Sequence, residues 1–183
     1  MSYKRWIFVA IFLFGVGVAF GLSTPTGIAR LISEDIAALK ELAGLLASLP
    51  LALVVVIIFT KNALALLLSF VFSPIFCLLP ILTLTINGWL LAFVSVIVSQ
   101  EKSIGFVLAG LLPHGIFELP ALILGEAAAL SFGTVVILAL FKKERRNLLL
   151  PSLKQNLRYL VVALALLLPA AIIETYVTPL LLT

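Results

Sequence analysis

Residues 63–99 read ALALLLSFVFSPIFCLLPILTLTINGWLLAFVSVIVS, without one charged side chain. The run has nearly the length of two membrane-spanning helices, because each needs about 20 apolar residues. Turn-forming and helix-disrupting residues stand near its middle: Pro74, Pro80 and Asn87-Gly88. We therefore expect a helical hairpin that either spans the bilayer or enters it and turns back, with any irregular backbone buried in protein or lining a cavity.

A second block, residues 103–141, has the same character. Its interruptions are three ionisable side chains and three helix-disrupting residues: His114, Glu118, Glu126, Pro113, Gly115 and Pro120. The length again suits two spans with almost no loop between them. We expect a second broken or re-entrant hairpin, which enters from the same side as the first.

The composition of the whole chain indicates a membrane protein. Hydrophobic residues make up 63% of it, charged residues make up 11%, and the mean hydropathy is +1.31. A soluble domain usually carries about 25% charged residues, so lipid must cover most of this surface. The net charge of +4 does not indicate nucleic-acid binding, because the basic residues stand in short segments beside apolar runs.

These patterns predict one all-α domain over residues 1–183, a polytopic bundle of transmembrane helices. The expected segments are about 6–22, 42–60, 63–80, 82–99, 104–119, 121–141 and 159–180. Between five and seven segments are expected in total, depending on how the hairpins cross. A signal peptide is the alternative for the first segment, but its apolar run exceeds the roughly 7–15 residues of a signal core.

A short amphipathic helix is expected before the second segment. Ser33 suits a helix N-cap, and Glu34 and Asp35 suit the first turn, where the helix dipole favours acids. Apolar residues follow at helical spacing: Ile36, Leu39, Leu42 and Leu46. Such a helix lies at the membrane surface. One bent helix that continues through Pro50 and two separate helices both remain open.

The distribution of basic residues predicts the orientation. Ten of the twelve stand at the expected cytoplasmic positions: Lys4, Arg5, Lys61, Lys102, Lys142, Lys143, Arg145, Arg146, Lys154 and Arg158. Basic residues near transmembrane segments are retained in the cytoplasm. We therefore expect a multi-pass protein of the cell (plasma) membrane, with a cytoplasmic N-terminus and an external C-terminus.

Ionisable residues within apolar segments are the candidates for function. If Pro113 begins a helix, His114 and Glu118 stand one turn apart on the same face. A protonated histidine and an ionised glutamate stabilise each other in low dielectric, so the pair suits a proton or cation site; the alternative is a polar clasp that fixes a bend. Together with His114 and Glu118, we expect a functional cluster of polar side chains that can include Glu126, Glu174, Asn62 and Asn87. Gly88, Pro113 and Gly115 belong to the same motifs and are expected to have structural roles. For Glu174, a place at the membrane interface is the alternative.

Small residues recur at helical spacing in two places. The positions are Gly17 and Gly21, and then Ala121, Gly125, Ala129 and Gly133. Such faces allow two helix backbones to approach closely. We expect contacts either within the chain or between copies in a homo-oligomer, of which a dimer is the simplest.

No enzymatic motif stands out. The sequence has no H-E-x-x-H pair, nucleophile elbow or phosphate-binding glycine loop. A zinc site would need His114 together with two carboxylates. We therefore expect no enzyme, no metal and no cofactor, and a metal-dependent intramembrane hydrolase is the weakest alternative.

Several motifs resemble the stage II sporulation protein M family. They are Asn62, Asn87-Gly88, Leu-Pro-His-Gly-Ile-Phe-Glu-Leu at residues 112–119 and Ile-Ile-Glu-Thr-Tyr-Val-Thr-Pro at residues 172–179. Ser69 and Ser73-Pro74 stand where the family usually has glycines. The resemblance implies a polytopic helical membrane protein without established activity or cofactor, whose namesake works with cell-wall hydrolases in spore-forming bacteria.

The leading expectation is a non-enzymatic scaffold that organises membrane or cell-envelope proteins. We expect the lipid bilayer to surround this protein, and we expect no nucleic acid among its partners. The alternative is a small transporter or channel that uses His114 and Glu118. A cavity that reaches His114 would favour transport, and a dry, fully paired cluster would favour the scaffold.

Overall fold

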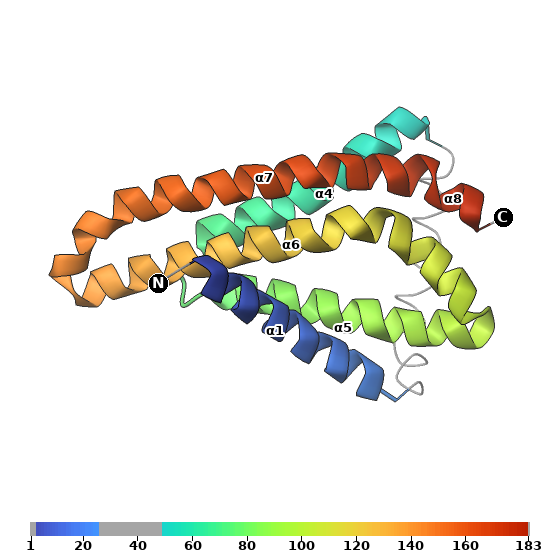
Figure 1. Cartoon of the computed structure of the whole chain (residues 1–183), viewed down its shortest axis with the longest axis horizontal. Helices are drawn as coiled ribbons and strands as arrows, with labels where there is room; N and C mark the ends of the chain where they lie inside the picture. The colour runs from blue at the N-terminus through green and yellow to red at the C-terminus, as the bar shows by residue number, and fades with distance from the viewer. Residues whose placement is uncertain (1–2, 26–48, 183) are drawn as a thin grey trace.

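The computed structural model describes residues 3–25 and 49–182, and all regular structure in these residues is helical (Figure 1). The elements are α1 (Tyr3–Ser23), α4 (Leu51–Phe72), α5 (Leu78–Glu101), α6 (Ile104–Phe141), the 3₁₀ segment η1 (Lys143–Leu148), α7 (Leu149–Tyr176) and α8 (Thr178–Leu181). The predicted all-α fold is confirmed. The amphipathic helix predicted around residues 33–46 lies outside the described residues.

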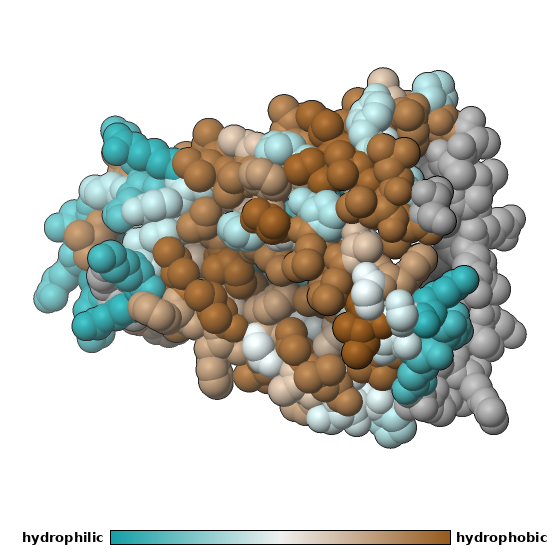
Figure 2. Space-filling model, turned by 45° about the vertical axis from the view of Figure 1, so that its right-hand side comes forward, coloured by the Kyte–Doolittle hydropathy of each residue, from teal (hydrophilic) through white to brown (hydrophobic). Residues whose placement is uncertain are grey.

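The surface of the helices suits a lipid environment. Five helical stretches are long and apolar enough to cross a membrane, with η1 and α7 counted as one stretch. Large apolar side chains stay exposed on them; Phe8 and Phe12 of α1, for example, are 71% and 69% exposed. Figure 2 shows a broad apolar surface, with the most hydrophilic residues toward the ends of the molecule. Lipid chains would cover this surface, since leaving so much apolar area in water is unfavourable.

The first predicted hairpin is present, but its turn lies earlier than the middle of the apolar run. Residues 73–77 join α4 to α5, so the chain reverses at Pro74, whereas Asn87-Gly88 lies inside α5. Phe76 and Cys77 adopt left-handed conformations, with φ values of 50° and 53°. Two consecutive left-handed residues are uncommon outside glycine, and here they allow a short reversal between two antiparallel helices.

The helix that leads into this hairpin also differs from the prediction. Pro50 caps α4 at its start, and the helix then continues without interruption to Phe72. The expected boundary between the segments 42–60 and 63–80 therefore does not exist. Lys61 and Asn62 lie at the middle of α4 and not in a loop.

The second predicted hairpin is instead one helix with a bend. α6 runs without interruption from Ile104 to Phe141 and contains both Pro113 and Pro120. Figure 1 shows it bending strongly in its first half, the half that contains the two prolines. A proline removes one backbone donor and pushes against the preceding turn, which bends a helix without ending it when neighbouring helices support the bend. The separate segments 104–119 and 121–141 are thus corrected to one.

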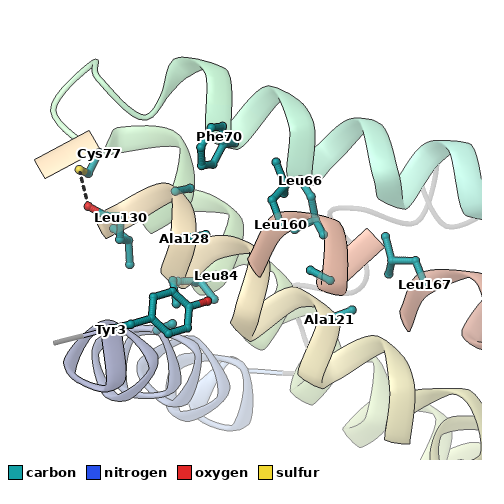
Figure 3. Packing of buried hydrophobic residues seen from close by; sticks show 14 of the residues in the cluster. Tyr3, Leu66, Phe70, Cys77, Leu84, Ala121, Ala128, Leu130, Leu160 and Leu167 are labelled. Atoms are coloured by element: carbon teal, nitrogen blue, oxygen red, sulfur yellow. Dashed lines mark hydrogen bonds between the residues drawn. The ribbon is translucent and has the colours of Figure 1, made fainter. Parts of the chain in front are cut away.

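α6 is the central helix of the bundle and packs against every other described helix. Residues 125–130 are buried on all sides of the helix, as expected for a helix surrounded by others. Figure 3 shows how Leu66 and Phe70 of α4, Leu84 of α5 and Tyr3 of α1 converge on this region. The Tyr3 hydroxyl donates a hydrogen bond to the Leu124 carbonyl oxygen at 2.8 Å, which fixes the start of α1 to α6.

The arrangement of the helices changes which basic residues lie together at one end of the bundle. The beginning of α1, the turn 73–77 and η1 lie at one end of the bundle, and residues 102–103 and α8 lie at the other (Figure 1). Lys102 therefore lies at the end opposite to the one predicted, and Lys61 lies along a helix. The basic residues at the end with η1 are Lys4, Arg5, Lys142, Lys143, Arg145, Arg146, Lys154 and Arg158.

Candidate functional site

Polar side chains from four helices meet inside the apolar bundle, and we call them the polar cluster: Asn62, His114, Glu118, Glu174 and Thr178. Continuous helix through Pro113 brings His114 and Glu118 onto one face, one turn apart. The His114 Nε2 and Glu118 Oε2 atoms are 3.7 Å apart, which is an ion-pair distance but too long for a hydrogen bond. Asn62 Nδ2 of α4 donates a hydrogen bond to Glu118 Oε1 at 3.1 Å.

The last helices complete the polar cluster. The other ring nitrogen of His114, Nδ1, lies 3.4 Å from the Thr178 hydroxyl at the start of α8. Glu174, near the end of α7, lies on the same side, so that one ligand atom from each of His114, Glu118 and Glu174 lies within 4.8 Å of the other two. Zinc bonds to imidazole and carboxylate are about 2.0–2.2 Å long, so small movements would bring these three atoms around an ion. The set of ligands that a zinc site would require is therefore present.

Lys61, which was expected between two helical segments, lies beside the polar cluster. Its charge lies close enough to Glu174 to interact with the carboxylate. The side chain is exposed on the surface of α4, and a lysine at this depth can extend its amine along apolar surface toward a polar partner. The signal in the sequence was a lysine in the middle of a 22-residue apolar stretch that begins after Pro50 and ends before Pro74.

Two cavities border the polar cluster. A cavity of about 40 Å³ touches Asn62, Asn87 and Glu118, and it has room for a small number of water molecules. A larger cavity of about 210 Å³ lies between α5 and the first part of α6 and reaches His114. Apart from His114 and Ser95, its lining is apolar. In the described part of the chain, neither cavity gives the cluster a polar route to an end of the bundle.

Glu126 is separate from the polar cluster, although the sequence grouped it with His114 and Glu118. It lies about 12 Å further along α6, at 1.5 Å per residue, and is fully buried. Its Oε2 atom forms a hydrogen bond with the hydroxyl of Ser69 on α4, whereas Oε1 has no hydrogen-bond partner among the described residues. The serine at a position where glycine was expected thus serves as the partner of a buried carboxyl group.

The small residues lie at close contacts within the chain. Added Cβ atoms at Gly17 and Gly21 would overlap the backbone of Thr85 and Trp89 on α5, and one at Gly88 would overlap the backbone of Phe14 on α1. On α6, Gly125 faces Leu66 and Gly133 faces the backbone of Ser73. The remaining small positions, Ala121, Ala129 and Gly115, are also buried. These faces hold the bundle together and are not free surfaces.

Comparison with known proteins gives a family match that covers most of the chain. The family model described as stage II sporulation protein M matches residues 7–179, which include every member of the polar cluster. A protein of Methanocaldococcus jannaschii described as uncharacterized is 25% identical over 174 residues, which cover 94% of this chain and 93% of the relative. No solved structure matches the chain. Because the match extends over nearly the whole length, the chain belongs to the stage II sporulation protein M family.

Proposed function

We propose that this protein is a non-enzymatic scaffold of the membrane, which organises other membrane or cell-envelope proteins. The observation that carries the proposal is the polar cluster, in which direct contacts between side chains join α4, α6 and α8, and Glu174 of α7 lies within 4.8 Å of His114 and Glu118. Such a cluster fixes the relative positions of helices. The described connections between helices are short, so partners would be met mainly through membrane-facing helix surfaces.

The surfaces available for such partners are on the outer helices. α1 and α4 bury the smallest share of their apolar stretches. On α4, Leu64 and Leu68 are each 50% exposed and stand one turn apart. A second copy of the chain and a different membrane protein are both compatible with these faces.

Photo-crosslinking tests the scaffold. We expect a photoreactive amino acid at Leu64 or Leu68 of α4, or at Phe8 or Phe12 of α1, to give a protein adduct of discrete mass from one face only. Adducts of lipid mass alone from both faces would contradict a scaffold, and equal protein adducts from both faces would indicate random collision. Mass spectrometry identifies the adduct.

Cation or proton transport is the second candidate. It is favoured by the His114, Glu118 and Glu174 ligand atoms, which lie within 4.8 Å of one another beside a cavity that reaches His114. Ionisable residues at membrane depth often mark ion paths. The apolar lining of the larger cavity speaks against it, because that lining offers almost no oxygen or nitrogen atoms to replace the hydration of an ion.

The variant Glu118→Gln separates the two functions, because it keeps the side-chain shape and hydrogen-bonding capacity but removes the charge. For a scaffold, we expect no charge movement from the wild-type protein in proteoliposomes under a proton or divalent-cation gradient, and the crosslinked adduct should persist in the variant. Charge movement in the wild type that disappears in Glu118→Gln would establish transport instead. Solid-supported-membrane electrophysiology measures the current.

We also propose that the end with η1 faces the cytoplasm, because the basic residues gather there. In a Cys77→Ala background, a cysteine at the exposed Lys102 should react with an impermeant maleimide on intact cells. A cysteine at the exposed Glu144 of η1 should react only after permeabilisation. The reverse labelling pattern would invert the orientation.

A further inference from the structure

A third cavity lies far from the polar cluster, at the end of the bundle with η1. It measures about 230 Å³, is partly open to the surface, and is lined by residues of α1, α6, η1 and α7. Its lining combines hydroxyl and amide groups with apolar side chains and one guanidinium group, that of Arg145. We call it the interfacial cavity, because here the apolar surface of the helices meets the charged residues of η1 and its neighbours (Figure 2).

Asn156 is the most informative residue of the interfacial cavity. Its side chain is almost completely buried, at 2% exposure. The amide nitrogen Nδ2 donates to the Ser152 carbonyl oxygen at 2.9 Å and lies 3.1 Å from the Ser152 hydroxyl. The amide oxygen Oδ1 has no hydrogen-bond partner among the described residues. A buried acceptor without a donor is unfavourable, so a group that occupies this cavity should bring a hydroxyl or another donor.

Arg145 supplies the charge of the interfacial cavity. Its guanidinium makes no ion pair with any acid in the described residues, and Glu144 is the only acid in η1. Lys142, Lys143 and Arg146 stand beside it in the sequence. An arginine binds a phosphate group through two parallel hydrogen bonds, so the cavity is suited to a phosphate-bearing anion.

The remaining walls indicate that this anion is attached to an apolar body. Val135 and Leu138 of α6 and Leu148 at the end of η1 line the cavity together with Trp6. Tryptophan is favoured at the level of lipid headgroups, and basic pockets between transmembrane helices bind anionic headgroups. We propose that the interfacial cavity binds an anionic phospholipid with a hydroxylated headgroup, its phosphate at Arg145 and its hydroxyl group donating to Asn156 Oδ1.

This site does not depend on the proposed scaffold function, and matched lipids test it directly. Phosphatidylglycerol and phosphatidylethanol carry the same single charge, but only the first has headgroup hydroxyls. In native mass spectrometry of the purified protein, we expect at least fivefold tighter binding of phosphatidylglycerol than of phosphatidylethanol. Equal affinity for the two lipids would overturn the role of Asn156, and equal affinity for phosphatidylcholine would overturn the anion site.

Two variants locate the site. Arg145→Gln should weaken phosphatidylglycerol binding at least fivefold, whereas Lys143→Gln, which removes the same charge from the same segment without lining the cavity, should change it less than twofold. Equal losses in both variants would mean diffuse attraction to a basic surface and would overturn the site. Displacement of the lipid by millimolar glycerol phosphate would assign the cavity to a soluble anion and would overturn the lipid proposal.

Discussion

Gly17→Ala is expected to separate α1 from α5 and to destabilise the protein strongly. A Cβ atom at Gly17 would overlap the carbonyl oxygen of Thr85, which belongs to the backbone of α5 and cannot turn aside as a side chain can. Overpacking usually costs about 1–3 kcal/mol, and we expect the upper part of that range or more, because two helices must move apart. Unfolding in mixed detergent micelles, followed by circular dichroism, measures the loss.

The same helix offers a matched control for this variant. Gly15 lies two residues earlier, and no atom lies within 4 Å of a Cβ built there. Gly15→Ala should therefore leave stability unchanged or raise it by less than about 1 kcal/mol, through the better helix propensity of alanine. If Gly17→Ala and Gly15→Ala behave alike, the close α1–α5 contact is wrong.

The apolar helices were predictable from the sequence, because length and lack of charge suffice to identify a span. The positions of the breaks were less predictable. Proline and Asn-Gly both suggest an interruption, but Pro80 lies in a first helical turn and Asn87-Gly88 fits inside α5. Gly88 leaves room for the backbone of α1, which approaches α5 closely at that point. The sequence of α5 alone does not reveal this contact.

The same limit applies to the candidate site. His114 and Glu118 belong together through helical spacing, so local sequence predicts the pair. Glu174 and Thr178 come from other helices, and Lys61 interacts with Glu174. Only the packing of α4, α7 and α8 on α6 brings these residues near the pair. Glu126 shows the opposite error, since it was a candidate for the same polar cluster, but it lies further along α6 and forms a hydrogen bond with Ser69 there.

His114→Leu is expected to give the second large effect, because His114 lies within 4.8 Å of the carboxylates of both Glu118 and Glu174. Without the imidazole, Glu118 and Glu174 would face each other across less than 5 Å, and Lys61, the positive charge that acts on Glu174, is exposed. Removing one partner of a buried ion pair costs about 3–5 kcal/mol. We expect about 2–4 kcal/mol here, because the Glu118 side chain is 33% exposed and its charge is partly relieved by its surroundings.

A second substitution tests whether charge is the cause of this loss. In the double variant His114→Leu/Glu174→Gln, one of the two facing carboxylates is neutral, so at least half of the lost stability should return. Glu101→Gln removes an acid at the exposed end of α5 and, combined with His114→Leu, should restore nothing. If Glu174→Gln also restores nothing, the imidazole acts by packing alone, and the polar cluster would no longer be an electrostatic unit that holds α6 to α7.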